Sequence, residues 1–216
     1  MKLLNSFGPN PRAVRMFMHE KGIEMPFEDL DLMGGDNRAE AYTKKNPGGQ
    51  MPSLELDDGS VFGETTAICE FLEEKHPTPV LIGSSAEHRA NTRQWIRRVE
   101  LNITEHLYNG FRYSDGIEIF RDRLYCIPEA ADGLKAKAQD SCKWLDGLIA
   151  GRDFIAGNDF SLPDIILYCC MDFVKDAGQP RDESLKNLSA WFERVDSRAS
   201  ATASIFPGSE AMKMRG

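Results

Sequence analysis

The first third of the chain, up to about residue 76, changes its hydrophobic period several times. Short apolar runs at residues 2–5 and 27–32 have the composition of strands. Between them, an apolar stripe at helical spacing ends where Gly22 supplies a stop signal, and its members are Ala13, Val14, Phe17 and Met18. A strand, a three-turn helix and a second strand in such close succession predict a right-handed crossover and a parallel strand pair.

A second set of elements completes this first third. Residues 37–45 are a polar stretch of helical composition, and the breaker Asn46-Pro47-Gly48-Gly49 follows them. Residues 53–62 predict two short strands joined as a hairpin by the turn Asp57-Asp58-Gly59. A helix is expected from Glu64 to about residue 76, so the predicted order is β-α-β-α-β-β-α.

Beyond a linker rich in Pro, Gly and Ser, the chain carries long helical patterns. An apolar residue recurs every four positions along the first helix, in the series Trp95, Val99, Ile103, Leu107 and Phe111. Further helices are expected over residues 117–126, 130–150, 161–177 and 184–196. The helix over 161–177 is apolar almost all round, so it is expected at the buried centre. The patterns predict an α/β domain over 1–78, a linker over 79–88 and an all-helical domain over 89–216.

Composition narrows the class of protein. The 216 residues are 41% apolar and 28% charged, which suits a folded globular chain. Lys and Arg number 26 against 34 Asp and Glu, and the net charge of −8 argues against nucleic acid or an anionic membrane as a partner. No apolar run approaches the ~20 residues of a membrane span and the first residues lack a signal-peptide core, so a cytoplasmic protein is expected.

The cysteines and histidines show no disulfide or metal pattern. The five cysteines are scattered and form no C-x-x-C pair, so reduced and buried thiols are expected. The four histidines lack the spacing of a metal site, and no metal is expected as a cofactor.

Residues 46–68 carry the most informative chemistry. The Met51-Pro52 pair, between a loop and a strand, suits a cis peptide bond that turns the Met51 backbone outward as an edge for an extended peptide. Glu64 and Thr65 lie where the free N–H groups of a helix start receive a carboxylate, and the Glu64 carboxylate accepts an ammonium. Singly, each residue also has a structural explanation, with Thr65 as a helix N-cap, Pro52 as a turn proline and Glu64 as a first-turn acid. Their joint spacing favours a receptor for the zwitterionic end of an amino acid.

With these motifs, the chain resembles the glutathione S-transferases over nearly its whole length. In the first domain the motifs are Pro11-Arg12-Ala13-Val14-Arg15, Glu20-Lys21-Gly22-Ile23, Asn46-Pro47-Gly48-Gly49-Gln50-Met51-Pro52 and Glu64-Thr65-Thr66-Ala67-Ile68. In the second, residues 157–164 look like the family's capping-box segment, in which Ser161 and Asp164 cap the central helix. The resemblance implies a thioredoxin-like N-terminal domain, an all-helical C-terminal bundle and a homodimer.

The resemblance also implies how glutathione, the co-substrate, is bound. The backbone of Met51, before Pro52, would pair with the cysteinyl unit, while Glu64 and Thr65 hold the γ-glutamyl end. For the glycyl carboxylate the candidates are Lys45 and Gln50, with Lys44 as an alternative. Both lysines are equally compatible with solvated helix charges.

The group that activates the glutathione thiol is not the usual one. Residues 6–12 contain no tyrosine or cysteine, and Ser6 falls early, at the end of the first strand. Asn10, at the mouth of the first helix, can donate an N–H to a thiolate with help from the helix dipole. The pattern is similar to a theta-like group of fungi and bacteria that lacks the catalytic Ser, Tyr or Cys. In that group residues of the first long C-terminal helix approach the sulfur, which here points to Tyr108 and Arg112.

Tyr108 and Arg112 have an alternative interpretation. They are four residues apart and share a helix face, so a phenol and a guanidinium can both stabilise a thiolate. Alternatively, Tyr108 lines the acceptor pocket and Arg112 makes a surface ion pair.

The expected activity is transfer of glutathione to small hydrophobic electrophiles. The acceptor site is expected to draw on residues of the helix over 161–177 and on Phe7, Tyr108, Phe111 and Arg112. Two alternatives remain: a specialised glutathione-dependent lyase, dehalogenase, isomerase or peroxide reductase, and a non-catalytic glutathione-binding or interaction module.

Overall fold

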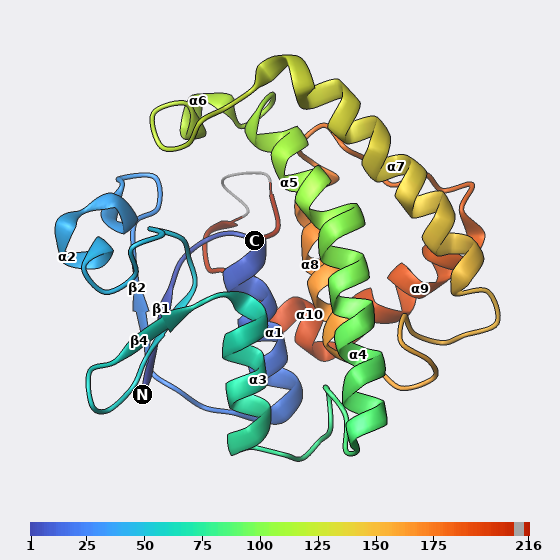
Figure 1. The fold of residues 1–216 in the computed structure, drawn as a ribbon, viewed down its shortest axis with the longest axis horizontal. Helices are drawn as coiled ribbons and strands as arrows, with labels where there is room; N and C mark the ends of the chain where they lie inside the picture. The colour runs from blue at the N-terminus through green and yellow to red at the C-terminus, as the bar shows by residue number, and fades with distance from the viewer. Residues whose placement is uncertain (210–213) are drawn as a thin grey trace.

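The computed structural model describes residues 1–209 and 214–216, and they form a sheet part beside a helical part (Figure 1). The sheet has the order β2-β1-β3-β4, built from β1 (Lys2–Asn5), β2 (Phe27–Asp29), β3 (Ser53–Glu55) and β4 (Val61–Gly63). β1 and β2 are parallel, and β3 is antiparallel to both β1 and β4. The predicted parallel pair and the predicted hairpin are therefore confirmed, although β2 ends at Asp29 and not at residue 32.

Helix α1 (Pro9–Lys21) packs between the sheet and the helical part. It begins with Pro9 in its first turn, where a missing N–H costs nothing, and ends at Gly22, whose φ of 64° is the left-handed conformation of a helix C-cap. Its start at Pro9 places Asn10 among the free N–H groups of the first turn.

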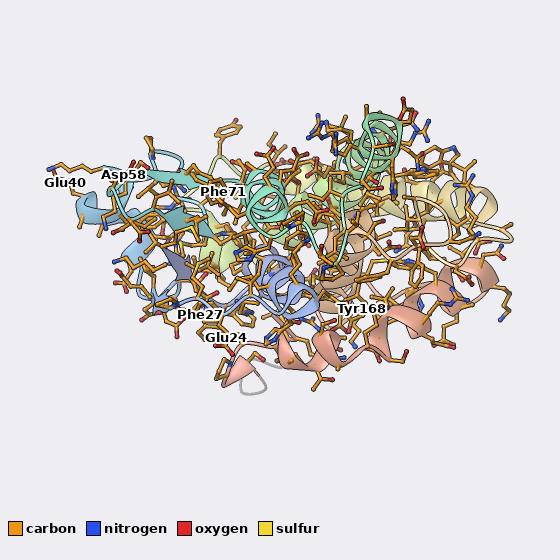
Figure 2. The ribbon with its side chains drawn as sticks, turned by 90° about the horizontal axis from the view of Figure 1, so that it is seen from below. Glu24, Phe27, Glu40, Asp58, Phe71 and Tyr168 are labelled. Atoms are coloured by element: carbon orange, nitrogen blue, oxygen red, sulfur yellow. The ribbon has the colours of Figure 1, made fainter. Side chains whose placement is uncertain are left out.

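The polar stretch over 37–45 is not one helix. It divides into a 3₁₀ turn, η1 (Asp36–Arg38), and α2 (Glu40–Thr43), because Ala39 between them is extended. α3 (Thr65–Lys75) then follows β4. Figure 2 shows Glu40 and Asp58 at the outer edge of the sheet part, away from Tyr168 in the helical part.

The first long helix of the helical part is continuous through three segments: α4 (Ala86–Val99), the π-helical η2 (Glu100–Thr104) and α5 (Glu105–Arg112). Apolar residues spaced by four overshoot an α-helical turn of 3.6 residues, so the stripe from Trp95 to Phe111 drifts around a regular α-helix. The wider π turn reduces that drift. All five stripe residues are consequently buried.

The remaining helices are α6 (Ile117–Phe120), the 3₁₀ turn η3 (Pro128–Ala130), α7 (Ala131–Leu148), α8 (Leu162–Val174), α9 (Lys186–Asp196) and α10 (Ala199–Ala203). The helix expected over 117–126 is only four residues long. Most of a short helix's stability comes from tertiary packing, and none of the α6 residues is fully buried. The helix therefore does not continue to residue 126.

Helix α8 is the buried centre that the sequence predicts. All 13 of its residues are buried, and the capping box of Ser161 and Asp164 is present at its start. The Asp164 carboxylate also accepts hydrogen bonds from the Ile155 backbone N–H and from Trp191 Nε1, at 2.9 and 2.7 Å. Burial raises the pKa of Asp164 to about 6, against these hydrogen bonds, which lower it.

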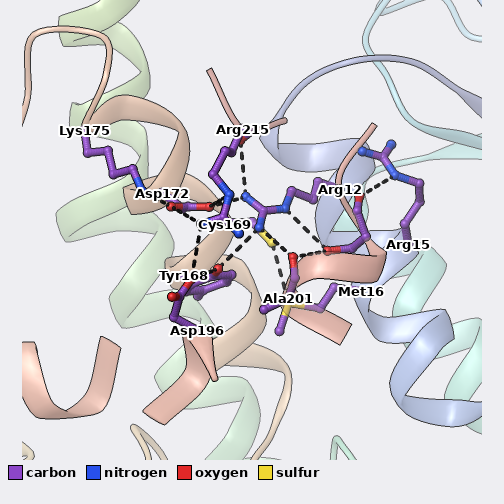
Figure 3. Close-up of polar contacts among 11 residues, drawn as sticks. Arg12, Arg15, Met16, Tyr168, Cys169, Asp172, Lys175, Asp196, Ala201 and Arg215 are labelled. Carbon is purple, nitrogen blue, oxygen red and sulfur yellow. Dashed lines mark hydrogen bonds and ion pairs between the residues drawn. The ribbon is translucent and has the colours of Figure 1, made fainter. Parts of the chain in front are cut away.

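A buried charge cluster joins α1 to α8 (Figure 3). Nη1 of Arg12 lies 2.6 Å from Asp172, and both side chains are fully buried. The Arg12 guanidinium also donates to the Tyr168 hydroxyl and to the Ala201 carbonyl, at 3.3 and 2.9 Å. Arg215 pairs with the same carboxylate at 3.3 Å. The cluster fixes the first turns of α1 against the helical part.

Candidate active site

Two cavities meet between the sheet part and the helical part. The aromatic cavity, of about 250 Å³, is lined by Phe7, Phe111, Phe120 and Phe173 among others. The polar cavity, of about 820 Å³, is lined by Pro52, Glu64, Thr65 and Glu100 among others. Five residues line both cavities: Asn10, Gln50, Met51, Tyr108 and Arg112. The junction of the two cavities is therefore formed by residues that the sequence singles out.

The polar cavity contains the start of α3. Glu64 occupies the N-cap position without a side-chain capping bond, and Thr65 is the first helical residue, so Thr65 is not the N-cap. The free N–H groups of the first turn can receive a carboxylate. Glu64 has a φ of 68°, the one non-glycine residue with positive φ among residues 1–209 and 214–216. Such a conformation costs about 1–3 kcal/mol and is typical of ligand-binding sites.

Met51 offers a free backbone edge between the cavities. The Met51–Pro52 peptide bond is cis, as the sequence predicts. The neighbouring Gln50 carbonyl accepts hydrogen bonds from the Tyr42 hydroxyl and from Asn46 Nδ2, at 2.6 and 2.9 Å. Among the described residues, no hydrogen bond engages the N–H or the carbonyl of Met51. An extended peptide can therefore pair with Met51.

Tyr108 and Asn10 are in contact at the junction. The Tyr108 hydroxyl donates a hydrogen bond to Asn10 Oδ1 at 3.1 Å, which leaves the Asn10 amide N–H groups for another acceptor. Burial, and next the neighbouring Cys170, raise the pKa of Tyr108 well above its usual value. Tyr108 therefore stays protonated at neutral pH and acts as a hydrogen-bond donor.

Ser6 follows β1 directly and is fully buried. Its hydroxyl donates to the Phe7 carbonyl at 3.1 Å. Ser6 lines the aromatic cavity but does not line the polar cavity. Its hydroxyl is thus engaged by the backbone, and Ser6 is not among the five residues at the junction.

Arg112 is held by aromatic rings. Its guanidinium carbon lies 5.6 Å from the ring centre of Tyr108 and 5.7 Å from that of Phe120, and Nη1 donates to Asn109 at 3.1 Å. In the described part of the chain no carboxylate is within ion-pair distance of Arg112, so the surface ion pair considered from the sequence does not form. Its charge faces both cavities.

Lys45 is the predicted site residue that the structure does not bring to a cavity. Its Nζ lies 2.7 Å from Glu55, and Nζ of Lys44 lies 2.8 Å from Glu40. Arg38, unlike either lysine, lines the aromatic cavity, and its Nε is buried without a partner in the described structure. Sequence reasoning missed Arg38, although an arginine in a polar stretch before the Met51 loop was the available signal.

The predicted acceptor residues Phe7, Tyr108, Phe111 and Arg112 all line the aromatic cavity. α8 contributes Phe173, and Met214, two residues before the C-terminal Gly216, forms part of the wall. Arg123, which follows α6, also lines this cavity and was not expected there.

No group of three or more His, Cys, Asp or Glu side chains is placed to hold a metal ion in residues 1–209 and 214–216. None of the helices in this part has the length and apolar character needed to cross a membrane.

Comparisons with known proteins match this geometry. The family model of the glutathione S-transferase N-terminal domain matches residues 7–75, and that of the C-terminal domain matches residues 126–199. Glutathione S-transferase 2 of Saccharomyces cerevisiae is 26% identical over 200 residues, which are 89% of this chain and 84% of the yeast protein.

Two solved structures are similar over nearly their full length. A glutathione S-transferase domain-containing protein of Marinobacter aquaeolei has a TM-score of 0.87 at 31% identity, covering 93% of this chain and 99% of that chain. Gtt2 from Saccharomyces cerevisiae has a TM-score of 0.88 at 27% identity, covering 95% of this chain and 100% of that chain.

Proposed function

This chain belongs to the glutathione S-transferase family, and we propose that it conjugates the glutathione thiolate to small hydrophobic electrophiles. One observation carries the proposal: Asn10, Gln50, Met51, Tyr108 and Arg112 line both cavities. A peptide paired with Met51 extends its γ-glutamyl end into the polar cavity and presents its sulfur to the aromatic cavity.

We propose that residues around Met51 bind glutathione in an extended conformation. The γ-glutamyl carboxylate is bound by the N–H groups at Thr65, and the γ-glutamyl ammonium by Glu64. The backbone of Met51, positioned by Pro52, pairs with the cysteinyl unit. Gln50 and Arg38 bind the glycyl carboxylate, because Lys45 is engaged by Glu55.

Asn10 is the proposed activator of the thiol. The sulfur of free glutathione, with a thiol pKa of ~8.5, is largely protonated at neutral pH. The Asn10 amide N–H groups, at the positive end of α1, donate to the thiolate and lower that pKa. Tyr108 holds the amide in this orientation through the 3.1 Å hydrogen bond.

The charge of Arg112 completes the proposed catalytic site. Its guanidinium at the junction stabilises the thiolate electrostatically. The thiolate electron pair attacks the electrophilic carbon, a C–S bond forms, and the leaving group departs with the electrons of the broken bond. Ser6 has no direct part in this scheme, because its hydroxyl donates to the Phe7 carbonyl.

We also propose the organisation of the working protein. Residues 1–78 bind glutathione, residues 79–88 link the domains, and residues 89–216 hold the electrophile. Two chains form a homodimer that acts in the cytoplasm and serves detoxification, as the family resemblance implies. Sedimentation at micromolar concentration tests the dimer.

Product analysis tests the activity. Purified protein, glutathione and 1-chloro-2,4-dinitrobenzene are expected to yield a stable thioether, identified by its mass, and free chloride. Recovery of unchanged or oxidised glutathione, with the organic substrate cleaved, isomerised or reduced, supports the lyase, isomerase or reductase alternative. Tight glutathione binding with no turnover of aryl halides, epoxides or peroxides supports a non-catalytic module.

A further inference from the structure

The aromatic cavity has an unbalanced charge. Three arginines, Arg38, Arg112 and Arg123, line it, and the described lining contains no Asp or Glu. The adjoining polar cavity is lined by the four glutamates Glu64, Glu70, Glu100 and Glu105. Because the whole chain has more acidic than basic residues, the positive charge is a local property of the aromatic cavity.

The positive charge of this cavity is not neutralised by the protein. Among the described residues, none of the three arginines forms an ion pair. Arg123 donates from Nη1 to the Leu32 carbonyl at 2.8 Å and from Nη2 to the Met33 carbonyl at 3.1 Å, and both acceptors are uncharged. Burial first, and then the neighbouring charge of Arg123, lower the pKa of Arg38. Two guanidiniums thus approach each other without an anion.

Bound glutathione, in the arrangement proposed above, brings two negative charges to this cavity. They are the glycyl carboxylate, assigned to Arg38, and the thiolate, assigned to Arg112. The charge of Arg123 is left without a counter-ion. An uncompensated charge in a partly dehydrated cavity favours an anionic ligand.

The rest of the wall is aromatic. Phe111 packs edge-to-face against Phe173 and Phe120, with ring centres 5.4 and 6.1 Å apart, and Phe7 lies 5.8 Å from Phe173. Arg123 follows Phe120 by three residues, and its backbone N–H donates to the Phe120 carbonyl at 2.9 Å. The cationic group therefore borders a wall suited to a planar ring.

We propose that the electrophile is a ring-bearing compound with an anionic group such as a carboxylate, and that Arg123 binds this group. The ring lies against the phenylalanine wall, and the electrophilic carbon faces the junction where Asn10 and Tyr108 meet. This inference rests on the proposed transferase function and deepens it. Arg123 is then a specificity-determining residue.

Two probes with the same reacting centre test the proposal. 4-Chloro-3,5-dinitrobenzoate carries a carboxylate, and 4-chloro-3,5-dinitrobenzamide is its uncharged counterpart. The readout is the ratio of their kcat/KM values, each divided by its rate constant without enzyme. We expect the wild-type protein to prefer the acid by about tenfold, equal to ~1.4 kcal/mol. The ratio is expected to fall to about one in Arg123→Gln and to remain high in Arg123→Lys.

Arg121→Gln is the matched control. It removes the same charge two residues away, but Arg121 is exposed and pairs with Glu118 on the surface. Its ratio is expected to equal that of the wild type. A wild-type ratio near one, or equal losses in Arg121→Gln and Arg123→Gln, contradicts the proposal.

Salt gives a test that does not depend on a variant. Raising ionic strength from about 0.01 to 1 M shortens the Debye length from about 30 to 3 Å, so the wild-type preference for the acid is expected to decrease. A preference that does not change with salt contradicts the proposal. If neither probe forms a thioether, the proposed transferase function itself fails. Thioethers from both probes at equal efficiency reject the proposed anionic electrophile and leave the transferase function standing.

Discussion

The Tyr108 hydroxyl donates a hydrogen bond to Asn10 Oδ1 over 3.1 Å, linking the first long helix of the helical part to the start of α1. The two residues are 98 positions apart in the sequence. Tyr108 uses the only acceptor of the Asn10 amide, so both amide N–H groups are directed elsewhere. In the proposed mechanism, this contact lets a chain with no tyrosine or cysteine near residue 10 present the Asn10 amide to the thiolate.

Tyr108→Phe tests the positioning role of the phenol. Without its hydroxyl the Asn10 amide is free to rotate, and we expect kcat/KM to fall about three- to tenfold, with a smaller change in glutathione affinity. Because the pKa of Tyr108 is raised well above its usual value, the wild-type rate is expected to show no step from this phenol up to pH 9. A wild-type step between pH 8 and 9 that disappears in Tyr108→Phe contradicts this role.

Glu64→Gly separates binding from stability. Glycine adopts a φ of 68° without strain, so the free energy of unfolding is expected to rise by about 0.5–1 kcal/mol. Loss of the carboxylate is expected to weaken glutathione binding about tenfold or more. Glu64→Gln is the control, since it loses the charge but keeps the strained backbone. Chemical denaturation measures the free energy of unfolding, and calorimetry measures glutathione binding. Unchanged glutathione affinity in both variants argues against Glu64 as the ammonium site.

The buried charge cluster predicts an order of stability losses. Asp172 also pairs with Lys175 at 2.6 Å and with Arg215 at 3.3 Å, so Arg12→Met leaves this carboxylate with two cations. Asp172→Asn leaves the fully buried Arg12 without a counter-charge and is expected to cost ~3–5 kcal/mol. Lys175→Met, at the edge of the cluster, is expected to cost below about 1 kcal/mol. Urea denaturation measures the free energy of unfolding of the three variants. A larger loss of stability in Arg12→Met than in Asp172→Asn contradicts the predicted order.

Asp164 predicts a pH dependence of stability. Its pKa is about 6 in the folded protein and near 3.8 when unperturbed, so between these values the folded state binds the additional proton. This contribution is therefore fully present below about pH 4 and is lost as pH rises through 6, by about 3 kcal/mol at ~1.4 kcal/mol per pH unit. Unfolding free energies of wild type and Asp164→Asn across pH 4–7 measure it. Parallel curves contradict the raised pKa.

Elements with local signals were predictable from the sequence. The parallel pairing of β1 and β2 follows from the close succession of a strand, a helix and a strand. The capping box of Ser161 and Asp164 follows from their spacing before an apolar run. The cavity residues around Met51 and Glu64 were also found, because a proline after a loop and a helix start are local features. In each case neighbouring residues decide the conformation.

Features that depend on distant contacts were not predictable. Lys45 forms an ion pair with Glu55 of β3, ten residues further along the chain. Arg38, which ends η1 just before the extended residue Ala39, lines the aromatic cavity instead. Arg123 lies in a segment expected to be helical to residue 126. Because α6 ends at Phe120, the chain turns and Arg123 reaches the Leu32 and Met33 carbonyls.

The titration of bound glutathione tests the central claim, that Asn10 stabilises its thiolate. Thiolate absorbance in the ultraviolet is measured against pH for the complexes of wild type, Asn10→Ala and the isosteric Asn10→Asp. We expect the wild-type thiol pKa to lie at least about one unit below its free value of ~8.5, that of Asn10→Ala to return towards it, and that of Asn10→Asp to rise further. Three coincident titrations, with glutathione bound in each case, contradict the claim.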